Sequence, residues 1–177
     1  GNIYIKGGFD PRFGHDDLWA LIHALNARGV RAIAGDVILD LSLKDSARLG
    51  WGWCWDDDNP TLTPLLISGK DRFMERFMHL LQEAGITVTM GWTSGTKPYE
   101  AVQIESRFHT IDQVLRPMMK ESDNLCAESM FFQMAALSRR PYANYRDAVA
   151  QMSKLITRWN VSPDEYQIVD GSGLSLY

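Results

Sequence analysis

LRPMMKESDNLCAE, residues 115–128, joins two helical segments and says most about the fold of this chain. A helix that Thr110 can cap is predicted through residue 119, and an apolar helix is predicted from about 125 to 137. Between them, Ser122-Asp123-Asn124 consists of residues that favour caps and turns. A serine hydroxyl placed there can relay a proton to a leaving group, and an asparagine amide can hydrogen-bond a substrate carbonyl. By itself, however, such a tripeptide is more often an ordinary turn between helices.

The spacing of apolar residues changes along the chain. The elements predicted up to residue 105 are strands at 2–6, 31–39, 86–90 and 101–105, helices at 18–27 and 71–84, and a loop at 91–98. Beyond Phe108 the pattern is mainly helical, with a further helix at 145–159, a strand at 166–169 and a tight turn at 170–173. The sequence therefore predicts a mixed α/β chain that divides near Glu105.

The composition is that of an ordinary soluble globular protein, with 45% hydrophobic and 23% charged residues. A net charge of −4 and a pI near 5.5 argue against a nucleic-acid partner, because no basic stripe is present. No run of about 18 apolar residues occurs, so no membrane span is expected. No signal peptide is recognisable, and the abrupt ends favour a part of a longer protein. Cys54 and Cys126 are better explained as two free thiols than as one bridge.

Four blocks spread over nearly the whole chain resemble one protein family. Residues 115–128 closely resemble the second-motif region of the type-4 penicillin-binding proteins, the D-alanyl-D-alanine carboxypeptidase/endopeptidase family. Penicillin-binding proteins carry S-D-N together with S-x-x-K and K-T-G. The other blocks follow the family's order: GGFDP at 7–11, GDVILD at 35–40 with GWCWDD at 52–57, and DGSGLS at 170–175.

The resemblance implies a fold and an activity. The expected fold is an inserted, partial α/β subdomain at 1–105 plus the helical part of a penicillin-recognising, β-lactamase/transpeptidase-like domain at 106–177. The expected activity is that of a periplasmic serine enzyme that removes D-alanine, or cuts a D-alanyl cross-link, through an acyl-serine intermediate. Its partners would be peptidoglycan stem peptides and, for the intact enzyme, β-lactam antibiotics. No metal or organic cofactor is needed.

The resemblance also assigns roles to residues. Ser122 would shuttle the proton, and Asn124 would hold the substrate amide and the lysine of the nucleophile, while Asp123 braces the loop. Asp57 would bind the amino group of the stem peptide at a wall that faces Leu174 to Leu176. Family members often carry arginine at the position of Leu176, so the resemblance does not extend to recognition of a carboxylate there.

The mechanism needs two further motifs, and neither occurs at its expected position in residues 1–177. S-x-x-K would precede Gly1 and K-T-G would follow Tyr177. The string Ser94-Gly95-Thr96-Lys97 fits S-x-x-K, but the nucleophile must start a helix, and the glycines and proline around this string favour a loop. We therefore expect the isolated chain to be inactive. The alternative is a non-catalytic peptidoglycan-binding or protein-interaction domain, and S-x-x-K in the full gene product would distinguish the two.

Two further patterns invite a structural interpretation. Trp51, Trp53 and Trp55 alternate, so in an extended segment they would share one face, as a core patch or as a prop for the acidic run that follows. That run, residues 56–59, lacks the spacing, the glycine and the distal glutamate of a calcium loop. The four histidines do not occur at zinc-ligand spacing, so no metal site is predicted.

Overall fold

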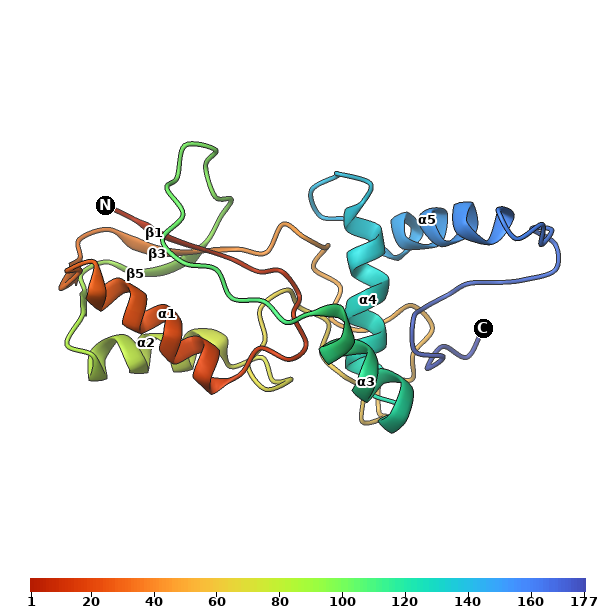
Figure 1. Ribbon diagram of the computed structural model, residues 1–177, viewed down its shortest axis with the longest axis horizontal. Helices are drawn as coiled ribbons and strands as arrows, with labels where there is room; N and C mark the ends of the chain where they lie inside the picture. Colours follow the sequence, from red (N-terminus) through yellow and green to blue (C-terminus); the bar gives the residue numbers. More distant parts are fainter.

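The computed structural model describes all 177 residues and places an α/β part beside a helical part (Figure 1). In chain order the elements are β1 (Ile3–Lys6), α1 (His15–Ala27), β2 (Ala32–Ile33), β3 (Asp36–Asp40), α2 (Phe73–Glu83), β4 (Thr87–Val88), β5 (Gly91–Ser94), α3 (Ile111–Glu121), α4 (Asn124–Ala136) and α5 (Tyr145–Thr157). The predicted mixed α/β class is confirmed. None of these helices is long and apolar enough to cross a lipid bilayer.

The α/β part is built on a parallel sheet with the strand order β1-β3-β5, and β2 pairs with β4 in a second parallel sheet. Helices α1 and α2 lie on one face of the larger sheet (Figure 1). Their apolar stripes meet there, because Leu18 of α1, Phe77 of α2 and Val37 of β3 are all buried in one core. The predicted strand-helix-strand order near the N-terminus is therefore correct.

The strand predicted at 31–39 is in fact two strands in two sheets. Gly35 separates β2 from β3, and its N–H donates to the Gly1 carbonyl at 3.2 Å. A Cβ at Gly35 would lie 2.1 Å from the Asn2 side-chain oxygen and 3.0 Å from the Gly1 carbonyl oxygen, so glycine lets residue 35 approach the N-terminus this closely. A continuous apolar run cannot show this break, since both halves are strands.

Three other predictions about strands and loops were wrong. Residues 101–105 and 166–169 are irregular, whereas β5 occupies the first half of the loop predicted at 91–98. Gly91 and Trp92 pair with Asp36 and Val37 of β3. Glycine-rich segments give a weak strand signal, so β5 depends on pairing with its neighbour rather than on its own propensity.

The helical part has a core of its own. Phe131, Phe132 and Ala135 of α4 pack there with Ala148 of α5. This core is completed by side chains that come before residue 105 in the sequence, namely Phe9, Trp53, Leu62 and Leu66. The division of the chain at residue 105 stays a prediction, and the helical part depends on earlier segments for its core.

Candidate active-site segments around helix α4

The turn between α3 and α4 is held by its own residues. Ser122 ends α3 in the left-handed backbone conformation, with φ 53°. Asp123 caps α4, and its Oδ1 accepts a hydrogen bond from the Cys126 N–H at 2.9 Å. This contact agrees with the bracing role expected of Asp123. The αL residue followed by an N-cap lets α4 start directly after α3.

Ser122 and Asn124 keep their side chains free of hydrogen bonds within the chain. Ser122 is exposed and Asn124, the first residue of α4, is half-buried. Their polar groups are therefore available to groups outside this chain, and their catalytic roles stay predictions. Cys126, two residues further along α4, is buried, and burial together with the charge of Asp123 raises the pKa of its thiol to about 12. Cys54 is also free, as expected.

The block GGFDP at 7–11 holds α4 from one side. The Ser129 hydroxyl donates to the Phe9 carbonyl at 2.6 Å, and the Gln133 amide donates to the Gly8 carbonyl. The Asp10 carboxylate accepts from the His109 backbone N–H at 3.0 Å and contacts the His109 ring nitrogen Nδ1 at 2.9 Å. Because His109 directly precedes the N-cap of α3, this block fixes both helices that flank Ser122.

The block DGSGLS at 170–175 holds α4 from the side of Glu128. Glu128 lies one turn after Asn124 and is 1% exposed. Its Oε1 accepts hydrogen bonds from the Gly171 N–H at 2.9 Å and from the Ser172 hydroxyl at 2.6 Å. A Cβ at Gly171 would lie 2.6 Å from the Ala127 carbonyl oxygen, so glycine lets the turn press against the helix.

The buried position of Glu128 changes the pKa of its carboxyl. Burial raises the pKa of its carboxyl above the ordinary 4.5, and the negative charge of Asp170 acts in the same direction. The hydrogen bonds from Ser172 and Gly171 act in the opposite direction and are the smaller effect overall. The carboxyl therefore costs the folded state more when it is ionised than when it is protonated.

The segment 50–57 is connected to the same turn. The Trp53 Nε1–H donates to Asp170 Oδ2 at 2.8 Å, and that oxygen also accepts from the Ser175 N–H at 2.7 Å. The Leu176 N–H donates to the Gly52 carbonyl at 3.1 Å. The blocks at 7–11, 52–57 and 170–175 thus meet around α4, although more than a hundred residues separate some of them.

The three tryptophans do not share a face, so that prediction was wrong. Trp53 is buried, Trp55 is 82% exposed, and Trp51 stacks between the rings of Tyr145 and Tyr177 at 5.7 and 4.5 Å. Alternation defines a face only in an extended strand. Here the Trp53 N–H donates back to the Gly50 carbonyl, and Gly52 has φ 78°, so the segment turns instead.

Asp57 is exposed in a tight turn, where its N–H donates to the Cys54 carbonyl and its own carbonyl accepts from the Asn59 N–H at 2.8 Å. Its carboxylate makes no hydrogen bond within the chain. Leu174 packs against the helical core, whereas Leu176 is 79% exposed. The contact between Leu176 and Gly52 brings the two segments together, but the role of Asp57, Leu174 and Leu176 in binding substrate stays a prediction.

The string Ser94 to Lys97 lies away from α4. Ser94 ends β5, and Lys97 follows in a loop where its N–H donates to the buried Asp40 carboxylate at 2.8 Å. The Lys97 ammonium donates to the Pro98 carbonyl at 2.9 Å. Neither residue is helical, which agrees with the interpretation that the string is no nucleophile motif. No three His, Cys, Asp or Glu side chains are grouped to hold a metal ion.

Comparison with known families decides what these segments belong to. The sequence matches the D-Ala-D-Ala carboxypeptidase 3 (S13) family over residues 1–67 and 65–177. The chain belongs to the D-Ala-D-Ala carboxypeptidase S13 family. The two matched stretches of the S13 family meet at 65–67, where the Ile67 N–H donates to the Lys70 carbonyl at 2.9 Å. Ser68 and Gly69, with positive φ, close this narrow turn.

One curated protein and two solved structures are similar to this chain. D-alanyl-D-alanine carboxypeptidase DacB of Haemophilus influenzae is 35% identical over 57 residues, which are 32% of this chain and 12% of that protein. The crystal structure of penicillin binding protein 4 (dacB) of H. influenzae matches with a TM-score of 0.90 at 18% identity, covering 99% of this chain and 57% of that one. The same protein complexed with a β-lactam matches with a TM-score of 0.77 at 19% identity, covering 100% and 55%. The fold is shared, and the chain spans just over half of these solved relatives.

Sequence reasoning did not single out Glu128. An acidic residue one turn after Asn124 in an otherwise apolar helix was the available signal, because a buried carboxylate needs partners. Its partners, Gly171 and Ser172, could not be read from the spacing. Within the S13 chain, Glu128 is the residue that connects the helix of the S-D-N motif to the DGSGLS turn.

Proposed function

We propose that this chain is the S-D-N- and DGSGLS-bearing portion of a serine D-alanyl-D-alanine carboxypeptidase/endopeptidase. The whole protein acts in the periplasm on peptidoglycan stem peptides through an acyl-serine intermediate that water resolves. The observation that carries the proposal is the arrangement around α4. Helix α4 starts with Asn124. Its Glu128 side chain is hydrogen-bonded to the DGSGLS turn, and its Ser129 side chain is hydrogen-bonded to the GGFDP block.

The proposed roles of Ser122 and Asn124 follow from the polar groups that they present at the N-terminal end of α4. A serine nucleophile attacks the carbonyl of the penultimate D-alanine, and the terminal D-alanine leaves with a proton. Ser122 helps to deliver that proton, because an exposed hydroxyl at a helix junction can donate and accept. Asn124 hydrogen-bonds the substrate amide and the nucleophile's lysine. The β-lactam complex of the solved relative supports β-lactam binding by the whole protein.

The first prediction is that this chain alone forms no covalent adduct with penicillin. A proton-relaying group needs an acyl-enzyme to act on, and the Lys97 ammonium donates to the Pro98 carbonyl and makes no hydrogen bond to Ser94. The measurement is incubation with a fluorescent penicillin, followed by a denaturing gel and intact mass, with the full gene product as the positive control. A stoichiometric adduct that Ser94→Ala removes would contradict the assignment. A full gene product that also fails to react would favour a non-catalytic binding domain.

The second prediction concerns substrate reading by Asp57. In the full gene product, Asp57→Asn is expected to lower kcat/KM by about one to two decades for stem peptides with a side-chain amine. The reason is that a hydrogen bond to a charged group contributes about 1.5–3 kcal/mol. Hydrolysis of a peptide without the amine should barely change. Asp58→Asn is the matched control, since it removes the same charge from the neighbouring exposed position.

Equal losses on both peptides would show that Asp57 supports the turn and does not read the amine. The same conclusion would follow if Asp58→Asn and Asp57→Asn behaved alike.

A further inference from the structure

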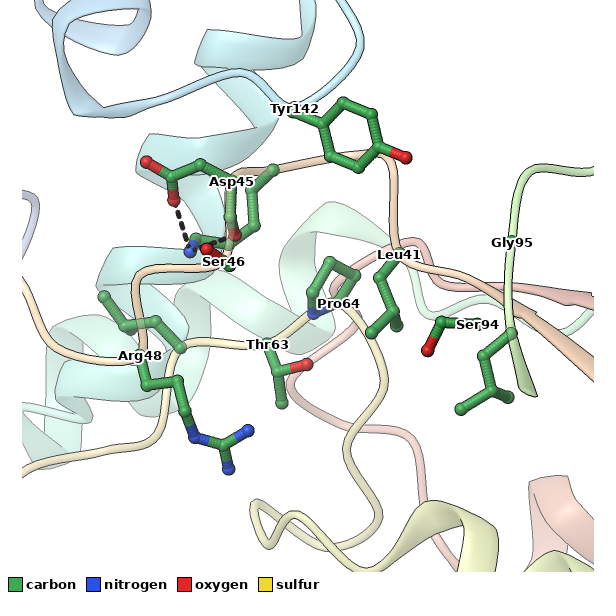
Figure 2. Close-up of a pocket in the computed structure, with 12 residues that line it drawn as sticks. Leu41, Asp45, Ser46, Arg48, Thr63, Pro64, Ser94, Gly95 and Tyr142 are labelled. Carbon is green, nitrogen blue, oxygen red and sulfur yellow. Dashed lines mark hydrogen bonds and ion pairs between the residues drawn. The ribbon is translucent and has the colours of Figure 1, made fainter. Parts of the chain in front are cut away.

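A cavity of about 260 Å³ lies where the α/β part meets the helical part. Ser94 and Gly95 border it at the carboxyl end of β5, and Leu39 borders it near the carboxyl end of β3. The opposite wall comes from the loop 44–48, from Thr63 and Pro64, and from Tyr142 (Figure 2). Ligands of open parallel sheets bind outside the carboxyl ends of the strands, and this cavity has that position. It is separate from Ser122 and Asn124, which do not line it.

Thr63 presents a hydroxyl to the cavity that is free of hydrogen bonds within the chain. The residue is 7% exposed, and its hydroxyl makes no hydrogen bond within the chain. Every fully buried side-chain nitrogen or oxygen of the chain does have a partner, so the Thr63 hydroxyl must face open space, which is the cavity that it lines. Figure 2 shows the hydroxyl oxygens of Thr63 and Ser94 on facing sides. A molecule that enters the cavity can therefore hydrogen-bond this hydroxyl in place of water.

The charges beside the cavity are already compensated. The Lys44 ammonium is buried and donates to the Asp45 carboxylate and the Asp45 carbonyl, both at 2.9 Å, and to the Ala47 carbonyl. Arg48 at the rim is paired with Asp71. An ionic ligand would therefore find no free opposite charge, whereas a neutral ligand can use the hydroxyls.

The rest of the wall is apolar. Pro64 and Leu41 are drawn above the gap between Thr63 and Ser94 in Figure 2, and the half-exposed ring of Tyr142 borders the cavity beyond them. A surface that alternates hydroxyls with aliphatic and aromatic carbon suits a molecule with hydroxyl groups around its edge and C–H groups on its faces. A pyranose ring has that pattern, and its size suits the cavity.

We infer that this cavity binds one neutral sugar unit, with its hydroxyl groups on Thr63 and Ser94 and a C–H face on Leu41 and Pro64. The site goes beyond the acyl-transfer chemistry and does not depend on it.

The experiment is an NMR titration of this chain with N-acetylglucosamine, methyl glucoside and, as the anionic comparison, acetate. We expect saturable shifts at the amides of Thr63, Ser94 and Gly95 with at least one sugar, at an affinity near about 1 mM, and none with acetate. Thr63→Val keeps the shape and removes the hydroxyl, so it should weaken binding about tenfold or more. Thr61→Val is the matched control, since Thr61 lies nearby and does not line the cavity.

Three results would overturn the inference: no saturable shift with either sugar, acetate bound at the same residues as tightly as a sugar, or unchanged sugar affinity in Thr63→Val. The melting temperature of Thr63→Val confirms that the variant is folded. If it loses folding, Ser94→Ala takes its place with the same expected loss, because Ser94 is exposed at the end of β5. Penicillin labelling of the full gene product carrying Thr63→Val should be unchanged, which separates this site from the proposed acyl-transfer function.

Discussion

Ser122→Ala in the full gene product is expected to slow acylation by penicillin by about 10²–10⁴-fold, because it removes a hydroxyl that relays a proton. The melting temperature should move by no more than a few degrees. Ser122 is exposed and its side chain makes no hydrogen bond within the chain, and such positions change stability by less than about 0.5 kcal/mol. Stopped-flow labelling with a chromogenic or fluorescent β-lactam measures the rate.

Ser106→Ala is the matched control for this prediction. Ser106 is also exposed and its hydroxyl makes no hydrogen bond within the chain, but it lies in the segment before α3. Its acylation rate should equal that of the unchanged protein. An unchanged rate in Ser122→Ala would remove Ser122 from the mechanism, and a large fall in melting temperature would show a structural turn residue.

Glu128→Ala is expected to cost this chain about 2–4 kcal/mol, because the Gly171 N–H and the Ser172 hydroxyl then lose their buried acceptor. For a chain of 177 residues this corresponds to a fall in melting temperature of roughly 5–15 °C. Calorimetry or circular dichroism measures it. Amide exchange should rise first in 170–175, since α4 no longer holds that turn.

The pH dependence of stability tests whether the Glu128 carboxyl is the cause. The folded-state pKa of Glu128 is raised, so the folded state holds the proton more tightly than the unfolded state. Its contribution to stability is therefore greatest at low pH and falls as pH rises above 4.5 toward the raised value. Glu128→Gln keeps an acceptor oxygen for both donors and cannot ionise. It should retain most of the stability and show a flatter decline across that range.

If Glu128→Gln had the same melting temperature as Glu128→Ala, the hydrogen bonds of residue 128 would not be what stabilises the turn at 170–175. A decline with pH as steep as in the unchanged chain would show that other groups cause it.

Helix α4 explains why the blocks at 7–11, 52–57 and 170–175 occur together. Each block contributes a contact that the others cannot replace: Phe9 and Gly8 present carbonyls to the helix, Trp53 binds Asp170, and Gly171 approaches the helix backbone closely. The separation between blocks in the sequence is thus no measure of their separation in the molecule.

The sequence by itself determined the helices, the Thr110 cap and the family. Thr110 was predicted to cap α3, and its N–H donates to the Gln113 side chain at 2.8 Å in the observed cap. The apolar stripes of α1 and α2 were predicted as well, since a periodic face is a local signal that needs no knowledge of the partner. The order of the motif blocks was enough to indicate the S13 family.

The tertiary structure alone decided which distant residues meet. β5 is a strand because β3 pairs with it, and Trp53 turns inward because Asp170 receives its N–H. Glu128 binds a turn more than forty residues away, and Thr63 faces a cavity that residues from both parts of the chain enclose. Such contacts depend on how separate segments are packed together. Propensity and spacing describe only neighbours along the chain, so they cannot carry this information.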